Sequence, residues 1–493
     1  MRATIMAAAL LLPAVLGASI EELFREKESR ALAFAERLSI EYGKRCESFA
    51  DCARSTYDNC VSAYPSQTCP ADGIKNPKCA GCGAGSSDAG AMAFDYTVSG
   101  IRLPASIAEG SNNQPATDEA AETICYTGKM EDFFTTEYEK DRAAEVYGDQ
   151  LPQMYFGAST GAFRIFPARH SPVCGTYDPR IRPWYVAASS GPKDVVLILD
   201  VSGSMRTAGR ADLMIDAARA VIKTLTIADW FSVVLFSSDA TTLGRWQGYL
   251  QPATTANKIA MHASFDSVHI GGGTNFKAGF AKAFEVLGAS VEQEYTAGCH
   301  KAILFLTDGE NTDGTPEEVL SAIATGNEPY DASIFAYSLG AGADSELPKS
   351  IACQNSGVWA QIADGADLVG SMSSYYQLFA RGLGDQENEG FTAWVEPYKF
   401  ASGDIMGTTV GAPVYDRTLT PPHFIGVAAV DMTVPFLEQQ SGSSYANILD
   451  GLVLRSRAMC PKLHLDTCVL QALRLSTVGL ESVCSAADTG GVD

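Results

Sequence analysis

The fold class of this chain is decided by one stretch, Val195-Val196-Leu197-Ile198-Leu199-Asp200-Val201-Ser202-Gly203-Ser204. Its first five residues form an uninterrupted apolar run, which is typical of a strand buried on both faces of a parallel sheet. Three oxygen-bearing side chains follow at once, on Asp200, Ser202 and Ser204. They alternate along the chain where the buried strand should open into a loop, so a functional site is expected there.

Strand-like and helix-like segments alternate from this stretch to about residue 383. Further strands are expected at 231–236, 302–306, 333–339 and 358–362, and helices at 211–225, 275–287, 316–325 and 366–382. This alternation predicts an α/β fold with a doubly wound, mostly parallel sheet and helices on both faces. Such sheets bind ligands beyond the carboxyl ends of their strands, near the point where the strand order reverses.

Two further segments should bring oxygen atoms to the same edge. A glycine loop, 271–273, delivers the Thr274 hydroxyl before a helix, and the strand at 302–306 is followed by Thr307 and Asp308. Oxygen ligands without His or Cys suit a hard cation rather than zinc. The predicted occupant is Mg²⁺, with Ca²⁺ or Mn²⁺ as substitutes. The predicted metal site consists of Asp200, Ser202, Ser204, Thr274 and Asp308.

The roles within this set follow from the chemistry of the groups. Ser202 and Ser204 would bind the ion directly, and Thr274 directly or through water. The two carboxylates would act through water, holding the hydroxyls and supplying negative charge. Without a direct carboxylate the ion keeps Lewis acidity for a carboxylate from outside. The alternative is a site that is structural or empty.

This order of residues resembles the metal-ion-dependent adhesion site of the von Willebrand factor A family, and the resemblance covers about residues 192–383. It implies a module for adhesion or protein binding that depends on a divalent cation and whose partner offers an Asp or Glu to the metal. Because no P-loop, nucleophile elbow or H-E-x-x-H spacing occurs, no enzyme is expected.

The flanking sequence has a resemblance of its own. It rests on Thr160-Gly161-Ala162-Phe163-Arg164-Ile165-Phe166-Pro167-Ala168, on Tyr177-Asp178-Pro179-Arg180-Ile181-Arg182-Pro183-Trp184-Tyr185, and on 394–398 and 424–431 as expected strands. These segments are similar to the alpha-2/delta subunits of voltage-gated calcium channels. There the A domain is inserted into an α+β, PAS-like Cache domain. The similarity over about 150–440 implies the same insertion here, and a cation channel subunit becomes one conceivable partner.

Cache domains of this kind that bind amino acids hold the carboxylate with an Arg and aromatic groups, and the ammonium with an Asp. A guanidinium fork fits a carboxylate in two places at once. An alternative function is therefore a sensor of amino acids or similar small molecules. Phe400 departs from the family, in which an acidic residue is usual. The alternative is that Arg182 and Trp184 only pack beneath the inserted domain. The matching positions are Tyr177, Arg182, Trp184, Tyr398 and Asp431.

Composition narrows the function classes. The 493 residues include 36 Lys and Arg against 58 Asp and Glu, a net charge of −22. A general nucleic-acid binder needs a basic face, and docking on anionic lipid needs one as well. Neither partner is therefore expected.

The N-terminus reads as a secretory signal, with Arg2 before an apolar run at 5–16 and small residues after it. A membrane anchor is the alternative, although the run is short for a span. No later segment is long and apolar enough to cross a membrane, so the mature chain should be secreted or luminal.

The 13 cysteines suit an oxidising compartment and predict disulfide bonds, with one cysteine left over. Cys79 and Cys82 could alternatively form half of a zinc site. A structural matrix or cell-wall protein is a further alternative if the odd cysteine links chains. The expected organisation is a signal peptide (1–18), an N-terminal helix (19–45), a Cys-rich insert and linker (46–90), the first part of the Cache domain (91–190), the A domain (191–385), the returning part of the Cache domain (386–440) and a Cys-containing tail (441–493).

Overall fold

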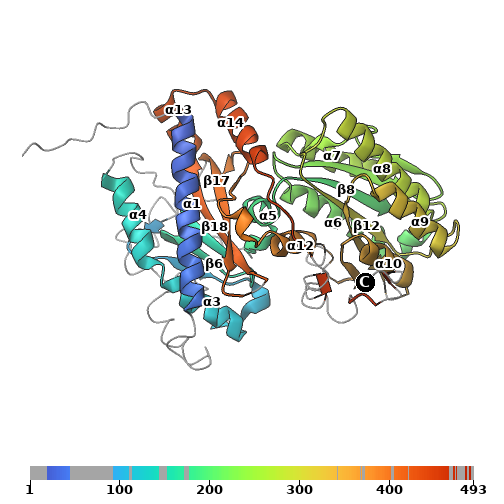
Figure 1. The fold of residues 1–493 in the computed structure, drawn as a ribbon, viewed down its shortest axis with the longest axis horizontal. Helices are drawn as coiled ribbons and strands as arrows, with labels where there is room; N and C mark the ends of the chain where they lie inside the picture. The colour runs from blue at the N-terminus through green and yellow to red at the C-terminus, as the bar shows by residue number, and fades with distance from the viewer. Residues whose placement is uncertain are drawn as a thin grey trace, which may run out of the picture.

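The computed structural model describes most of the chain from residue 19 onward (Figure 1). The expected signal peptide and the Cys-rich insert at 46–90 lie outside the described residues. The described residues are 19–44, 93–109, 114–143, 153–170, 177–465 with gaps at 341, 367, 369–371, 373, 401–404 and 420, and then 470, 471, 474, 483–485, 488 and 489.

A mostly parallel sheet forms one lobe, the A-type lobe, which carries the predicted metal site. Its strand order is β10-β9-β8-β12-β13-β14. The strands β9, β8, β12, β13 and β14 run parallel to one another. The chain goes from β8 to β9 on one side and later crosses to β12 on the other, so the order reverses at β8. The short strands β10 and β11 both pair antiparallel with β9. The bounds are β8 Lys193–Asp200, β9 Trp230–Phe236, β10 Ala240–Thr242, β11 Gln251–Pro252, β12 His300–Thr307, β13 Ser333–Leu339 and β14 Trp359–Ile362.

Helices cover both faces of this sheet because successive side chains of β8 point to opposite sides. Val196 and Ile198 belong to a core with α8 (Phe276–Glu292), α9 (Pro316–Asn327) and α10 (Glu346–Gln354). Leu197 and Leu199 belong to a second core. The helices of that second face are α6 (Arg210–Thr224), α7 (Thr255–Ser264) and α12 (Ser374–Gly382). The predicted doubly wound α/β class is confirmed.

An antiparallel sheet forms the other lobe, in the order β15-β17-β18-β5-β6-β2, with β16 paired to β17. Its strands come from both sides of the parallel sheet in sequence, so the A-type lobe is inserted into it. Two small antiparallel pairs, β1 with β7 and β3 with β4, lie beside it. The bounds are β1 Ala93–Asp95, β2 Gly100–Arg102, β3 Ala108–Glu109, β4 Gln114–Pro115, β5 Met154–Ala158, β6 Phe163–Phe166, β7 Ala168–His170, β15 Ala393–Trp394, β16 Tyr398–Lys399, β17 Met406–Asp416 and β18 His423–Thr433.

The long helix α1 (Ile20–Gly43) lies across one face of the antiparallel sheet (Figure 1). Ser19 and Glu22 begin it with a reciprocal capping box. Its buried aromatic residues Phe24 and Phe34 join a core shared with that face of the sheet. Among the described residues, this lobe also contains α3 (Asp118–Gly128), α4 (Glu131–Ala143), α13 (Val434–Ser441) and α14 (Tyr445–Ala458).

The two lobes share one continuous core. Helix α5 (Pro183–Ser190) packs on the opposite face of the antiparallel sheet from α1 and also contacts α12 of the A-type lobe. Tyr185 of α5 meets Tyr376 of α12 and Phe424 of β18 in edge-to-face contacts. In Figure 1, α5 and α12 lie between the lobes. This packing places one sheet against the other and creates the space for a cavity between them.

One local expectation is wrong, and the structure defines two other segments more closely. The segment 394–398 is not one strand, because Pro397 cannot donate to a ladder, and the chain forms the separate strands β15 and β16. The motif at 177–185 ends in a helix, α5, which begins at Pro183 as a proline at the first helical position allows. The tail after residue 441 contains α14, which packs on β15 and α13.

Two of the expected disulfide bonds lie within the described residues, Cys299–Cys460 and Cys353–Cys484. Both join the A-type lobe to the C-terminal segment. Cys125 is disulfide-bonded as well. In the part of the chain that the structure describes, no helix combines the length and apolar character that a membrane crossing requires.

Candidate metal centre and adjoining cavity

The five predicted metal-site residues lie at the carboxyl edge of the parallel sheet. Asp200 ends β8, and Asp308 follows the last residue of β12. The glycine loop is held against the end of β8 by two backbone bonds, from Gly203 N–H to the Gly272 carbonyl (3.2 Å) and from Gly271 N–H to the Val201 carbonyl (2.6 Å). Thr274 therefore reaches the same edge just before α8 begins.

The hydroxyl and carboxylate oxygens converge on one point. The Oγ atoms of Ser202 and Ser204 are 3.0 Å apart, and Ser204 Oγ donates to Asp308 Oδ1 at 2.7 Å. Gly309 leaves room beside them, since a Cβ there would lie 3.3 Å from Thr274 Oγ1 and 3.5 Å from Ser204 Oγ. A side chain at 309 would therefore lie against the hydroxyls of Thr274 and Ser204.

Asp200 is buried beneath this cluster. Its Oδ1 accepts from the Ser202 N–H at 2.8 Å, and its Oδ2 accepts from the Thr307 hydroxyl at 2.6 Å. Burial raises the pKa of Asp200 to about 6; these hydrogen bonds oppose the shift and the charge of Asp308 adds to it. A nearby divalent cation would relieve this electrostatic cost because it favours the ionised carboxylate.

The donor set fits a hard divalent cation. All the converging atoms are hydroxyl or carboxylate oxygens, which Mg²⁺, Ca²⁺ and Mn²⁺ bind, and neither His nor Cys is among them. Ser204 is exposed while Asp200, Ser202, Thr274 and Asp308 are buried, so the set is reached from one side only. That arrangement can offer a bound ion to a group arriving from solvent.

Sequence reasoning missed two side chains of the centre. Thr307 holds Asp200, and its only signal in the sequence was its place beside Asp308. Arg210, the first residue of α6, donates from Nη1 to Asp308 Oδ2 at 3.0 Å, and no local pattern indicated it. Asp313, which lies close to Asp308 in the sequence, accepts from Asn275 Nδ2 at 3.0 Å and is exposed.

Comparison with known proteins assigns this lobe. The family model of the von Willebrand factor type A domain matches residues 195–310, which include all five positions. The chain contains a von Willebrand factor type A domain. The resemblance of this lobe to the von Willebrand factor A family is therefore confirmed over residues 195–310, while the metal site stays a prediction.

Curated relatives extend the similarity beyond the A domain. The human voltage-dependent calcium channel subunit alpha-2/delta-2 is 26% identical over 385 residues, which cover 73% of this chain and 31% of that protein. The rat subunit alpha-2/delta-3 is 26% identical over 359 residues, 70% of this chain and 31% of that protein. The chain thus spans about a third of the length of these relatives. Among solved structures, a von Willebrand factor type A protein from Catenulispora acidiphila covers 49% of this chain and 57% of its own, at 18% identity and a TM-score of 0.34.

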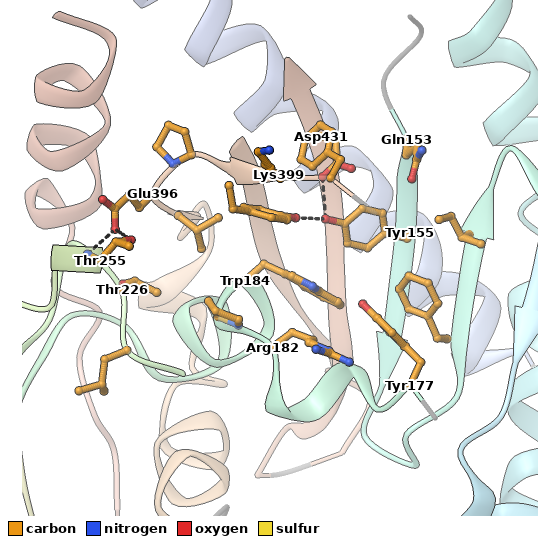
Figure 2. A pocket seen from close by; sticks show the side chains of 18 of the residues that line it. Gln153, Tyr155, Tyr177, Arg182, Trp184, Thr226, Thr255, Glu396, Lys399 and Asp431 are labelled. Atoms are coloured by element: carbon orange, nitrogen blue, oxygen red, sulfur yellow. Dashed lines mark hydrogen bonds between the residues drawn. The ribbon is translucent and has the colours of Figure 1, made fainter. Parts of the chain in front are cut away.

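A cavity of about 460 Å³ lies between the A domain and the antiparallel sheet (Figure 2). It brings together all five residues proposed for the small-molecule pocket, Tyr177, Arg182, Trp184, Tyr398 and Asp431. The other lining residues are Gln153, Tyr155, Phe163, Ile165, Pro183, Leu225, Thr226, Thr255, Lys258, Val395, Glu396, Pro397, Lys399 and Phe400.

An acidic end of the cavity is built around Asp431 of β18. Its Oδ1 accepts from the Tyr155 hydroxyl at 2.6 Å and from the Thr409 hydroxyl at 2.7 Å, and the Tyr398 hydroxyl lies 2.8 Å from Thr409 Oγ1. Burial, with the nearby charge of Asp431, raises the pKa of Tyr155 well above its ordinary value, so Tyr155 stays a donor. Tyr155 and Thr409 were not foreseen, because they face Asp431 from β5 and β17, the two neighbours of β18 in the sheet, and the local sequence does not encode that pairing.

A basic end lies across the cavity on the α5 side. The Arg182 guanidinium lies over the Tyr177 ring, 4.6 Å from its centroid. Its Nε is buried and has no hydrogen-bond partner among the described residues. Trp184 meets Tyr155 edge to face at 4.9 Å, and in Figure 2 its ring lies between the Arg182 and Asp431 ends. The two charged groups therefore face a shared space with an aromatic wall.

The A domain supplies the remaining wall. Lys258 of α7 donates from Nζ to the Leu225 carbonyl at 2.8 Å, and burial lowers its pKa although Glu396 opposes the shift. Glu396, on the returning chain, accepts from the Thr255 N–H at 3.0 Å and its hydroxyl at 2.8 Å. These contacts join the two lobes at the cavity, and sequence reasoning had not connected them with it.

A second group of potential metal ligands, Cys299, His300 and Cys460, lies at the opposite edge of the A-domain sheet. The two cysteines form a disulfide bond, so their sulfur atoms are not available as thiolate ligands. His300 stacks on Phe379, and burial lowers its pKa to about 4. This group is therefore a structural joint between the A domain and the C-terminal segment.

Proposed function

We propose that this protein is a secreted or luminal binding module that uses a divalent cation to hold an Asp or Glu of a protein partner. The observation that carries the proposal is the convergence of Ser202, Ser204, Thr274 and Asp308 on one accessible point above the buried Asp200. An A domain and relatives that are calcium channel subunits support it. A cation channel subunit is the partner class that the relatives' names suggest.

Each residue has a definite task in this proposal. Ser202 and Ser204 would hold Mg²⁺, Ca²⁺ or Mn²⁺ directly, and Thr274 directly or through water. Asp200 accepts from the Ser202 N–H and the Thr307 hydroxyl, and Asp308 accepts from the Ser204 hydroxyl; both would supply negative charge to the ion through water. An ion held in this way would supply a Lewis acid for the partner's carboxylate.

The metal step can be tested on the purified full chain with Mn²⁺ as the probe. Electron paramagnetic resonance of free Mn²⁺ should report saturable binding at one site, and Mg²⁺ should compete. Asp308→Ala and Ser204→Ala should each abolish this binding. Asp313→Ala is the matched control, because it removes an exposed carboxylate from the same loop. Equal loss in all three variants, or no Mn²⁺ binding by the wild type, would refute the metal step.

The partner step requires a carboxylate. An array of immobilised peptides that differ only by Asp or Glu against Asn or Gln should retain the protein on acidic members in Mg²⁺ and release it in EDTA. If the protein stays bound in EDTA, or binds the Asn and Gln peptides as well as the Asp and Glu peptides, binding does not depend on the ion.

The cavity favours a second candidate function, the sensing of amino acids or similar small molecules. Arg182 and Asp431 offer opposite charges across about 460 Å³ with aromatic walls, which suits a molecule with a carboxylate and an amine. The amide Gln153 and the phenol of Tyr398 add polar contacts. Because Asp431 already accepts two hydroxyl donors at Oδ1, an ammonium would have to approach its remaining surface.

Calorimetry with a panel of amino acids tests this second function. Arg182→Ala should abolish any binding. Arg180→Ala is the matched control, because Arg180 is paired with Asp178 at 2.6 Å and does not line the cavity. An absence of heat with every member of the panel, or normal binding by Arg182→Ala, would reject the sensor.

A further inference from the structure

One guanidinium is built into the metal centre. Arg210 donates from Nη1 to Asp308 Oδ2 at 3.0 Å, while its Nε and Nη2 donate to the two oxygens of Asp364 at 2.8 and 3.0 Å. The Arg210 side chain is 14% exposed, and that of Asp308 is fully buried. One oxygen of Asp308 therefore accepts from Ser204, and the other accepts from Arg210, whose guanidinium is always charged.

The protein provides a dedicated slot for this guanidinium. Gly340, which follows β13 with φ +95°, lies directly under it, and a Cβ there would fall 2.2 Å from Arg210 Nη2. Asp308 follows β12 and Asp364 follows β14, so the loops after three adjacent parallel strands all meet Arg210. A surface arginine that reached Asp308 by chance would need neither a glycine at 340 nor a second partner at Asp364.

We propose that Arg210 is an electrostatic regulator of the metal centre, which lowers the affinity of the site for its divalent cation by occupying one oxygen of Asp308. This inference rests on the proposed metal site and deepens it. A fixed positive charge beside a divalent cation opposes binding, and it also takes up negative charge that would otherwise neutralise the ion. The ion is then held less tightly but remains a stronger acceptor for an incoming carboxylate.

The test compares charge with geometry at one position. The dissociation constant for Mn²⁺ is measured on the full chain of the wild type, Arg210→Gln and Arg210→Lys. Removal of the charge in Arg210→Gln should tighten binding by about tenfold or more. Arg210→Lys keeps the charge but cannot span Asp308 and Asp364 as a fork, so its affinity should stay near that of the wild type.

Arg219→Gln is the matched control. Arg219 lies on the same helix, α6, and pairs with Asp266 at 2.9 Å, away from the metal centre. It makes the same change in net charge and should leave Mn²⁺ affinity unaltered.

The results distinguish failure of the metal site from failure of the role proposed for Arg210. Failure of the wild type to bind Mn²⁺ would remove the metal site itself and the regulator with it. If the wild type binds Mn²⁺ but Arg210→Gln is no tighter than Arg219→Gln, or is weaker, the regulator alone is refuted. A tenfold change in Arg210→Lys would also overturn it, because geometry rather than charge would then control the site. Melting temperatures of all variants verify that each is folded.

Discussion

Asp229 should be a main support of the A domain and of the cavity wall beside it. It lies in the turn between α6 and β9, and both it and Lys193 are buried to within 1%. Its Oδ1 accepts from Lys193 N–H at 3.1 Å and Nζ at 3.0 Å, and its Oδ2 accepts from Thr226 N–H at 2.7 Å and Oγ1 at 3.1 Å. Asp229→Ala leaves a buried ammonium without a counter-charge, which typically costs about 3–5 kcal/mol.

The prediction can be measured by differential scanning calorimetry at neutral pH. For a domain of this size the loss corresponds to a melting temperature lower by roughly 6–20 °C. Asp229→Asn should show most of the same loss, since its amide keeps the shape but removes the counter-charge of Lys193 and turns an NH₂ donor toward the Thr226 N–H. Because Thr226 lines the cavity, any small-molecule affinity should fall as well.

Asp216→Ala is the control for Asp229→Ala. Its side chain is 72% exposed and lies 3.5 Å from Arg219, so its removal should change the unfolding free energy by no more than about 1 kcal/mol. If Asp229→Ala were as stable as Asp216→Ala to within that margin, the assignment of a buried, structurally required ion pair would be wrong.

Three further outcomes are expected. Mg²⁺ at a hundredfold its dissociation constant should raise the unfolding free energy by about 2.7 kcal/mol, and Ser204→Ala should not respond; a thermal shift assay with and without EDTA measures this. The pKa of His300 is lowered to about 4, so the unfolded chain binds more protons between pH 6.5 and 4 and stability falls as the pH drops through that window. His300→Gln should remove about 2 kcal/mol of that pH dependence in denaturant titrations, a value reduced for partial exposure, and an unchanged slope would contradict it. Replacing Cys299 and Cys460 together by Ser, which opens a link of sequence separation 161, should cost about 2–5 kcal/mol, and an unchanged midpoint in urea would show the bond to be dispensable.

Local sequence patterns were sufficient for the A domain. The run 195–199 has no polar residue, which is typical of a strand covered on both faces of a parallel sheet. Polar groups at the carboxyl ends of parallel strands lie at one edge of the sheet, so Asp200 and Asp308 could be placed together from the sequence alone. The two short strands on either side of Pro397 show the limit of the same reasoning. A short segment does not reveal at which residue its hydrogen bonds to the neighbouring strand are interrupted.

Residues that act on those groups from other elements could not be found in this way. Arg210 and Asp308 are 98 positions apart, and Tyr155 and Asp431 are 276 apart. Nothing in the local periodicity of either partner encodes the contact. The five cavity residues were found only because the flanking sequence resembles a known family.

The sequence alone therefore determined the class of the inserted sheet and which oxygen atoms gather at its edge, since both depend on alternation and on strand polarity, which are properties of short segments. Tertiary structure decided what surrounds those atoms. The slot at Gly340 for Arg210, and the part of the cavity wall that Lys258 and Glu396 form, exist only once strands far apart in the chain pair in one register and α5 packs the two sheets together.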